Sequence, residues 1–158
     1  MIDDGRALFE VIYERNFPDV WRFAFWKTGS REDADEITAQ VFAAAFETRL
    51  RYSPERGSER AWLLGIAMNR LRTHWRSRAR RLRRSSLLDE QPSDPMEIEA
   101  MNLRMVLAQL PREKQQLLVL RFSLGLSHAE IARITRSSEA ATKMAIHRLL
   151  RSLKEKVR

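Results

Sequence analysis

The charge of this chain reverses abruptly near its middle. Residues 70–84 contain eight arginines and no acid, whereas residues 85–100 contain five acids, two prolines and no base. A proline-containing segment with one sign of charge and few apolar side chains cannot build a core, so it is typical of a linker. The chain should therefore fold as two small domains, residues 1–84 and 102–158, joined by an acidic flexible linker at residues 85–101.

Both domains are predicted to be helical. Apolar residues recur at intervals of three and four, and the 158 residues include only five glycines and five prolines, which favours an all-α fold. Because proline lacks the amide donor that a helix needs, Phe17-Pro18 should separate a short first helix from a second that ends at Gly29. Ser30 and Ser58 should cap the next two helices, with a loop at residues 52–57 between them. Their expected inner faces carry Ile37, Val41, Ala44 and Ala45, and Leu63, Ile66, Ala67 and Leu71.

The second half ends in a predicted helix-turn-helix. Two helices are expected first, one at residues 103–110 and one that starts at Pro111. Ser127 and Glu130 form a capping-box pattern for a helix that reaches about Arg136, and Ser137-Ser138 should form the turn before the last helix. The inner stripe of that helix is expected to contain Ile146, Leu149, Leu150, Leu153 and Val157, with Met144, His147, Arg148 and Arg151 on the opposite face. A second helix with a basic outer face can enter the major groove of DNA, although a plain helical hairpin has a similar pattern.

Composition argues against an enzyme. The chain has no cysteine, and its three histidines fall in three different predicted helices without a partner at metal-ligand spacing. Neither a phosphate-binding glycine loop nor a nucleophile elbow is present, so we expect no catalytic residue, no metal and no cofactor. The start MIDDGRALFE lacks a signal-peptide pattern and no apolar run could cross a bilayer, which predicts a cytoplasmic protein without membrane contact.

The basic character of the chain points to a polyanionic partner. Its net charge is +8, with most of the excess in the arginine block at residues 70–84. That block contains Trp75, and Trp62 and Tyr52 precede it; arginines beside aromatic rings suit single-stranded nucleic acid. The alternative is a solvated helix end whose arginines complement the helix dipole. Asp33, Glu36 and Gln40 share a helical face that is either an ordinary acidic helix start or a docking face for a basic protein.

These segments together resemble a known family, the small two-domain bacterial RNA polymerase sigma factors of the extracytoplasmic-function (ECF) type. SREDADEITAQVF and SERAWLLGIAMNRLRTHWRSRARR resemble the family's core-binding and promoter-melting segments, and LPREKQQLLVLRFSLGLSHAEIARI resembles the start of its upstream promoter-reading domain. The resemblance implies region 2 of a sigma factor at residues 1–84 and region 4 at residues 102–158. It also implies that the chain binds core RNA polymerase and directs promoter recognition, DNA melting and transcription initiation.

The resemblance assigns residues to three contacts. Those that dock on the clamp helices of the largest polymerase subunit are Asp35, Glu36, Ala39, Gln40 and Phe42. Those that grip the melted minus-10 strand are Tyr52, Ser53, Arg56, Ser58, Glu59, Trp62, Asn69, Arg70, Arg72 and Arg76. Those that face the minus-35 duplex are Lys143, Met144, His147 and Arg148. The family also implies contact with the flap of the second-largest subunit and an anti-sigma protein as a further partner. Because no long apolar seam is left over for dimerisation, we expect the free chain to be a monomer.

The sequence departs from the family pattern in the docking segment, where Ala39-Gln40 replaces Gln-Glu, and in the last helix. There Ser137 and Thr142 stand where a helix-turn-helix ordinarily buries an aliphatic side chain, so we expect a weakly stable second domain. The alternative function is a stand-alone helix-turn-helix regulator, which would have to dimerise to bind two half-sites.

Overall fold

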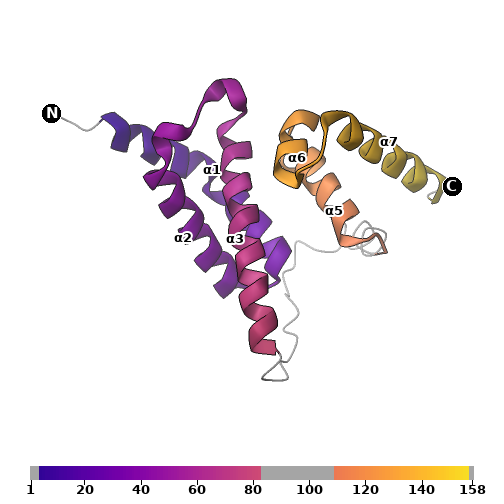
Figure 1. The fold of residues 1–158 in the computed structure, drawn as a ribbon, viewed down its shortest axis with the longest axis horizontal. Helices are drawn as coiled ribbons and strands as arrows, with labels where there is room; N and C mark the ends of the chain where they lie inside the picture. The colour runs from indigo at the N-terminus through magenta and orange to yellow at the C-terminus, as the bar shows by residue number, and fades with distance from the viewer. Residues whose placement is uncertain (1–3, 83–108, 157–158) are drawn as a thin grey trace. The chain divides into compact units, whose positions relative to one another are not determined.

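The computed structural model describes residues 4–82 and 109–156. Every regular element in these ranges is a helix (Figure 1). The chain divides into two compact units, Met1–Pro92 (unit 1) and Ser93–Arg158 (unit 2). The expectation of an all-α protein with two small helical domains is therefore confirmed. The predicted linker at 85–101 and the predicted helix at 103–110 lie outside the described residues, apart from the last two positions of that helix.

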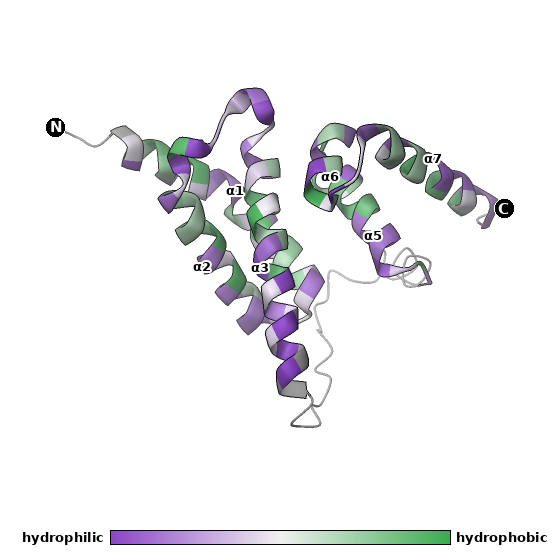
Figure 2. Ribbon diagram, in the orientation of Figure 1, coloured by the Kyte–Doolittle hydropathy of each residue, from purple (hydrophilic) through white to green (hydrophobic). Residues whose placement is uncertain are grey.

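Unit 1 is a bundle of three helices that all contact one another: α1 (Asp4–Thr28), α2 (Arg31–Glu47) and α3 (Glu59–Leu82). Two short 3-10 turns, η1 (Arg49–Arg51) and η2 (Pro54–Arg56), form the connection between α2 and α3. The fully buried side chains of the bundle include Val20, Phe23, Ile37, Val41, Leu63, Leu64 and Leu71. Figure 2 shows that the first half of α3 mixes apolar and polar residues, whereas its second half is strongly hydrophilic.

The predicted break at Phe17-Pro18 is wrong, because α1 runs through Pro18 without interruption. Pro18 lies on the exposed side of the helix, where the carbonyl that its missing N–H leaves unpaired can be hydrated. Side chains on both sides of the proline are buried in the core, Ile12 before it and Val20 and Phe23 after it, which stabilises the continuous helix. Tertiary packing therefore outweighs the local cost of the proline.

The predicted caps of unit 1 are confirmed. Gly29 takes a left-handed φ of 69° that ends α1, and the Ser30 hydroxyl accepts from the Asp33 amide at 3.2 Å to begin α2. The Ser58 hydroxyl accepts from the Ala61 amide at 3.1 Å and caps α3. Of the expected inner residues, Ala44 and Ile66 are only half-buried.

The described part of unit 2 contains α5 (Arg112–Leu118), the π-helical turn η3 (Val119–Ser123), α6 (His128–Thr135) and α7 (Glu139–Lys156). The capping box of α6 is confirmed, since the Ser127 hydroxyl accepts from the Glu130 amide and the Glu130 carboxylate accepts from the Ser127 amide, each at 3.1 Å. Arg136 adopts a left-handed φ of 57° and ends α6. Ser138 caps α7 through the Ala141 amide at 3.1 Å. The predicted helix-turn-helix is therefore present as α6 and α7.

Two details of the predicted core of unit 2 need correction. Leu150 is 42% exposed and Ser137 is exposed, so neither belongs to the core. Thr142, in contrast, is only 2% exposed, and its hydroxyl has no hydrogen-bond partner within the described residues. Val157 lies outside the described residues.

Candidate nucleic-acid interface

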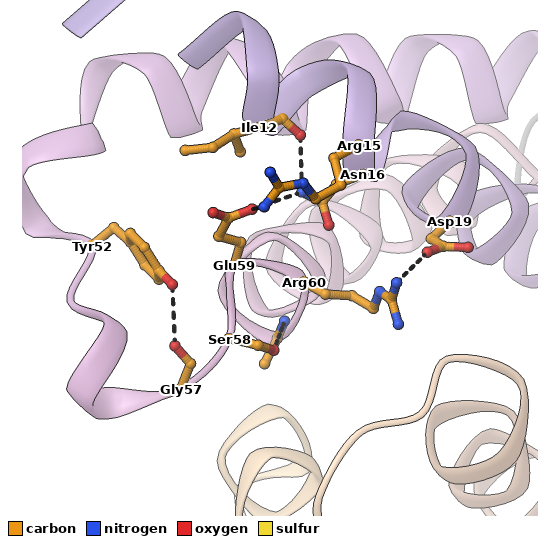
Figure 3. Close-up of polar contacts among 10 residues, drawn as sticks. Ile12, Arg15, Asn16, Asp19, Tyr52, Gly57, Ser58, Glu59 and Arg60 are labelled. Carbon is orange, nitrogen blue, oxygen red and sulfur yellow. Dashed lines mark hydrogen bonds and ion pairs between the residues drawn. The ribbon is translucent and has the colours of Figure 1, made fainter. Parts of the chain in front are cut away.

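An aromatic pair and a side-chain hydrogen bond help to order the connection between α2 and α3, together with backbone hydrogen bonds such as that from the Arg56 amide to the Ser53 carbonyl at 3.1 Å. The centres of the Tyr52 and Trp62 rings lie 5.1 Å apart. Figure 3 shows the Tyr52 hydroxyl donating to the Gly57 carbonyl, at 3.3 Å. Gly57 has φ 154° and ψ 175°, a conformation that is essentially restricted to glycine. The loop at residues 52–58 is therefore held by its own side chains and by the first turns of α3.

Its side chains present mainly polar groups to solvent. Arg56 and Ser58 are exposed, and Ser53 and Tyr52 are half-buried. The two predicted strand-binding aromatics, Tyr52 and Trp62, therefore contact each other beside the loop, with their rings tilted by 31°. Aromatic rings can stack with unpaired bases.

Glu59, the first residue of α3, faces α1. Its Oε2 accepts from Asn16 Nδ2 at 3.2 Å and lies 3.6 Å from Arg15 NH1 (Figure 3). The next residue, Arg60, pairs with Asp19 at 3.0 Å. The sequence reading missed Asn16, Asp19 and Arg60, since the partners are far apart in the chain and no local pattern marks them.

The predicted phosphate-binding arginines follow along α3. Arg70 and Arg76 are exposed, with no salt bridge to a carboxylate in the described residues, and Asn69 is exposed beside them. Arg72 is half-buried and its NH1 donates to Asn69 Oδ1 at 3.1 Å. The exposed guanidinium groups of Arg70 and Arg76 thus give this part of α3 a basic surface that attracts phosphates.

Trp75, the aromatic residue of the basic block, contacts a lysine of α1. Lys27 is 6% exposed, and its Nζ lies 4.9 Å from the Trp75 ring centre and 5.4 Å from the Trp26 ring centre. One face of Trp75 is thus occupied by a cation from α1. His74 Nε2 lies 3.4 Å from Asp33 Oδ2, which ties the same stretch of α3 to α2.

The predicted docking residues of α2 divide into a surface group and a core residue. Asp35, Glu36 and Ala39 are exposed, and Gln40 Nε2 donates to Glu36 Oε1 at 3.3 Å. Asp35 Oδ1 accepts from Trp21 Nε1 at 2.7 Å.

Phe42 belongs to the core of unit 1. It is 4% exposed and packs against the rings of Tyr13, Phe17 and Phe9 at 4.7, 6.1 and 6.5 Å. A partner that docks on α2 would therefore meet the polar side chains above, while Phe42 holds α2 to α1.

The predicted duplex-facing residues of α7 share an exposed face. Lys143, Met144, His147 and Arg148 are all exposed, and the opposite face buries Thr142, Ile146 and Leu149. This is the arrangement that a recognition helix requires.

Neither a metal site nor a membrane span emerges from the part of the chain that the structure describes. No three histidine or acidic residues there converge to hold a metal ion. None of its helices is long and apolar enough to cross a bilayer.

Comparisons with known families match both halves of the chain. The family model described as Sigma-70 region 2 matches residues 12–81, and the one described as Sigma-70, region 4 matches residues 100–153. Among relatives, the chain is 30% identical to the ECF RNA polymerase sigma factor SigD of Mycobacterium tuberculosis, over 98% of this chain and 78% of SigD. It is 27% identical to the ECF sigma factor BldN of Streptomyces coelicolor, over 92% of this chain but only 58% of BldN.

Two solved structures have a similar fold. The sigma factor RpoE of Bartonella quintana, in complex with the anti-sigma factor NepR, gives a TM-score of 0.74 at 18% identity and covers 93% of this chain and 94% of that one. CnrH, in complex with the cytosolic domain of CnrY, gives a TM-score of 0.67 at 24% identity and covers 96% of this chain and 88% of that one.

Proposed function

The chain belongs to the ECF family of RNA polymerase sigma factors, and from this premise we propose that it binds core RNA polymerase and directs it to promoter DNA. One observation carries the proposal: region 2 and region 4 both match, in the family's order, and each corresponds to a compact helical unit. In this proposal the chain works in the cytoplasm, where it determines at which promoters the polymerase starts and helps to separate the DNA strands. It supplies no catalytic residue, because the polymerase carries out the chemistry.

The loop at residues 52–58 and α3 of unit 1 are proposed to hold the melted minus-10 strand. Unstacking a base costs a few kcal/mol, and capture of the extruded base offsets this cost. The Tyr52–Trp62 pair offers an aromatic surface for such a base, and Ser53, Arg56 and Ser58 surround it with polar groups. Exposed Arg70 and Arg76, with Arg72 and Asn69 between them, suit the phosphates of the strand.

The exposed face of α2 is the proposed contact with the clamp helices of the largest polymerase subunit. Asp35, Glu36, Ala39 and Gln40 present an acidic and amide surface there, which suits a basic partner. Contact with the flap of the second-largest subunit, and threading of the acidic segment toward the RNA exit path, are proposed from the family alone.

Unit 2 is the proposed reader of the minus-35 duplex. Lys143, Met144, His147 and Arg148 lie together on the exposed face of α7, so they can reach base edges and phosphates when α7 enters the major groove. An anti-sigma protein is a further proposed partner, supported by the solved complex of RpoE with NepR. The free chain is proposed to be a monomer.

The competing function is a stand-alone helix-turn-helix regulator, for which the exposed basic face of α7 is the favouring observation. Gel filtration of the chain alone and with core polymerase, followed by duplex binding, separates the two. The sigma-factor proposal predicts a monomer that co-elutes with core polymerase and binds promoter duplex tightly only in that complex. A dimer that binds duplex tightly without polymerase would support the regulator.

A further inference from the structure

Two polar links join the start of α3 to α1, and we call them the α1–α3 clasp. In the first, the Glu59 carboxylate accepts from Asn16 at 3.2 Å and pairs with Arg15 at 3.6 Å. In the second, Arg60 pairs with Asp19 at 3.0 Å. Figure 3 shows both links on the side of α3 that faces α1.

Asn16 is the fixed point of the clasp. Its side chain is 2% exposed, and its Nδ2 donates to the Ile12 carbonyl at 2.9 Å as well as to Glu59. A buried amide with two acceptors on one nitrogen cannot turn without losing a hydrogen bond, which is costly in an apolar surrounding. Asn16 also cannot reach a nucleic acid, because it is buried.

Glu59 is poorly suited to contact DNA. Its side chain is only 25% exposed, and its carboxylate already receives two donors from α1. A free carboxylate next to a phosphate strand would also be repelled. Its place at the first turn of α3 is favoured by the positive end of the helix dipole.

The clasp lies directly beside the residues that hold the C-terminal end of the loop at residues 52–58. Ser58 and Gly57 directly precede Glu59, and Gly57 accepts the hydrogen bond from Tyr52. Trp62, which supports the Tyr52 ring, lies on the same first turn of α3. If the start of α3 shifts relative to α1, the loop and its aromatic surface shift with it.

We infer that the α1–α3 clasp sets the base selectivity of the loop, with Glu59 and Asn16 as positioning residues that do not touch DNA. This inference rests on the proposed function, because the loop is the proposed grip on the minus-10 strand. Selective capture of bases requires placement to within a fraction of an ångström.

The test uses the full chain with core RNA polymerase. A promoter is first selected from a random library with the wild-type protein, and transcription is then compared between that promoter and its single minus-10 substitutions. The variants are Glu59→Ala, Asn16→Leu, their combination, and Glu59→Gln, which keeps an acceptor for Asn16. The matched control is Glu10→Ala, which removes an exposed ion pair with Arg6 on the same helix.

We expect Glu59→Ala and Asn16→Leu each to reduce discrimination about tenfold at several minus-10 positions, since a small misplacement of a binding group is costly. The double variant should lose little more than either single one, because the residues act as a unit. Glu59→Gln should keep most of the discrimination and Glu10→Ala all of it. Amide hydrogen exchange at residues 52–58 should accelerate in the Glu59→Ala and Asn16→Leu variants, with exchange in α2 unchanged.

Three results would overturn the inference. Loss of preference at one base position in Glu59 variants, with Asn16→Leu unaffected, would make Glu59 a DNA contact. Wild-type discrimination in Glu59→Ala would mean that the clasp does not control selectivity, while the sigma-factor proposal would stand. Unchanged amide hydrogen exchange at residues 52–58 in these variants would mean that the clasp does not order the loop. This measurement requires no promoter DNA.

Failure of the proposed function is recognised separately, as an absence of promoter-specific transcripts from the wild-type chain. Thermal melts check that each variant is folded. Glu59→Ala, at a partly exposed position, carries the comparison if Asn16→Leu does not fold.

Discussion

Units 1 and 2 each bury a threonine hydroxyl among described helices that differ in length. Thr38 of α2 is 1% exposed and Thr142 of α7 is 2% exposed, and neither hydroxyl has a hydrogen-bond partner within the described residues. Unit 1 surrounds its threonine with three helices of 25, 17 and 24 residues. Unit 2 has helices of 7, 8 and 18 residues in its described part.

The comparison teaches that a buried hydroxyl matters more when the core around it is smaller. An unsatisfied buried hydroxyl costs about 1–3 kcal/mol wherever it lies. A small domain has only a few kcal/mol of net stability, so the same cost takes a larger share of it. We therefore expect unit 1 to be the more stable of the two units and unit 2 to be marginally stable.

The largest expected effect breaks the core of unit 1 alone. Phe23 is 1% exposed, and Phe23→Ala should destabilise the unit by about 3–5 kcal/mol. All four tryptophans, Trp21, Trp26, Trp62 and Trp75, lie in unit 1, so their fluorescence reports its melting. The midpoint temperature of the fluorescence transition should fall steeply. The part of the circular-dichroism transition that comes from unit 2 should keep its midpoint.

The control for this variant is Leu50→Ala, because Leu50 is 93% exposed and its truncation should change little. If Phe23→Ala lowered the melting of both units together, they would not be energetically separate and the comparison would fail.

Next in size is a charge reversal on the docking face of unit 1. Glu36→Arg with Gln40→Arg should abolish co-elution with core polymerase, because like charges across an interface cost several kcal/mol. A matched control, Glu10→Arg with Glu14→Gln on α1, makes the same change in net charge at exposed positions. Unchanged co-elution of the first pair would remove this face from the proposed interface.

The basic surface of α3 should give a smaller but distinctive change. Replacement of Arg70, Arg72 and Arg76 by alanine should weaken promoter opening at all sequences and flatten its salt dependence by about three slope units, one for each phosphate contact. Base preference should survive, because it belongs to the loop. A change in promoter choice with an unaltered salt slope would show that these arginines read bases instead.

The smallest effect compares the two buried threonines directly. Thr38→Val and Thr142→Val should each stabilise the protein by about 1 kcal/mol, since each removes an unsatisfied hydroxyl without changing shape. The rise in melting temperature should be larger for unit 2, and a fragment of residues 102–158 should be marginally folded until Thr142 is replaced. Promoter use should not fall.

Thermal melts of the full chain and of the fragment measure these changes. A highly stable fragment that Thr142→Val destabilises would mean that the hydroxyl is satisfied and the two units do not differ as described.

Local signals in the sequence were sufficient to predict most of the helix ends. Ser30, Ser58 and the Ser127–Glu130 box act as predicted, because a cap depends on residues within one turn of itself. The exposed faces of α2 and α7 were also predicted, since helical periodicity fixes which side chains share a face. The contacts of these faces with polymerase and DNA stay predictions.

Contacts between distant segments could not be predicted from the sequence. Pro18 was predicted to end a helix, but α1 continues through it, and Val20 and Phe23 beyond the proline are buried in the core of unit 1. Asn16 and Glu59 are 43 positions apart, and only the folded bundle brings them together. The clasp was missed for this reason, although it lies directly beside the predicted loop.

The measurement that tests the central claim most directly is transcription by core RNA polymerase with and without the purified chain, on a random promoter library. The sigma-factor account predicts that the chain makes the polymerase start at a defined set of promoters that share a minus-10 sequence. It also predicts that the starts disappear when Glu36 and Gln40 are replaced by arginine. Starts that are the same with and without the chain would contradict the account.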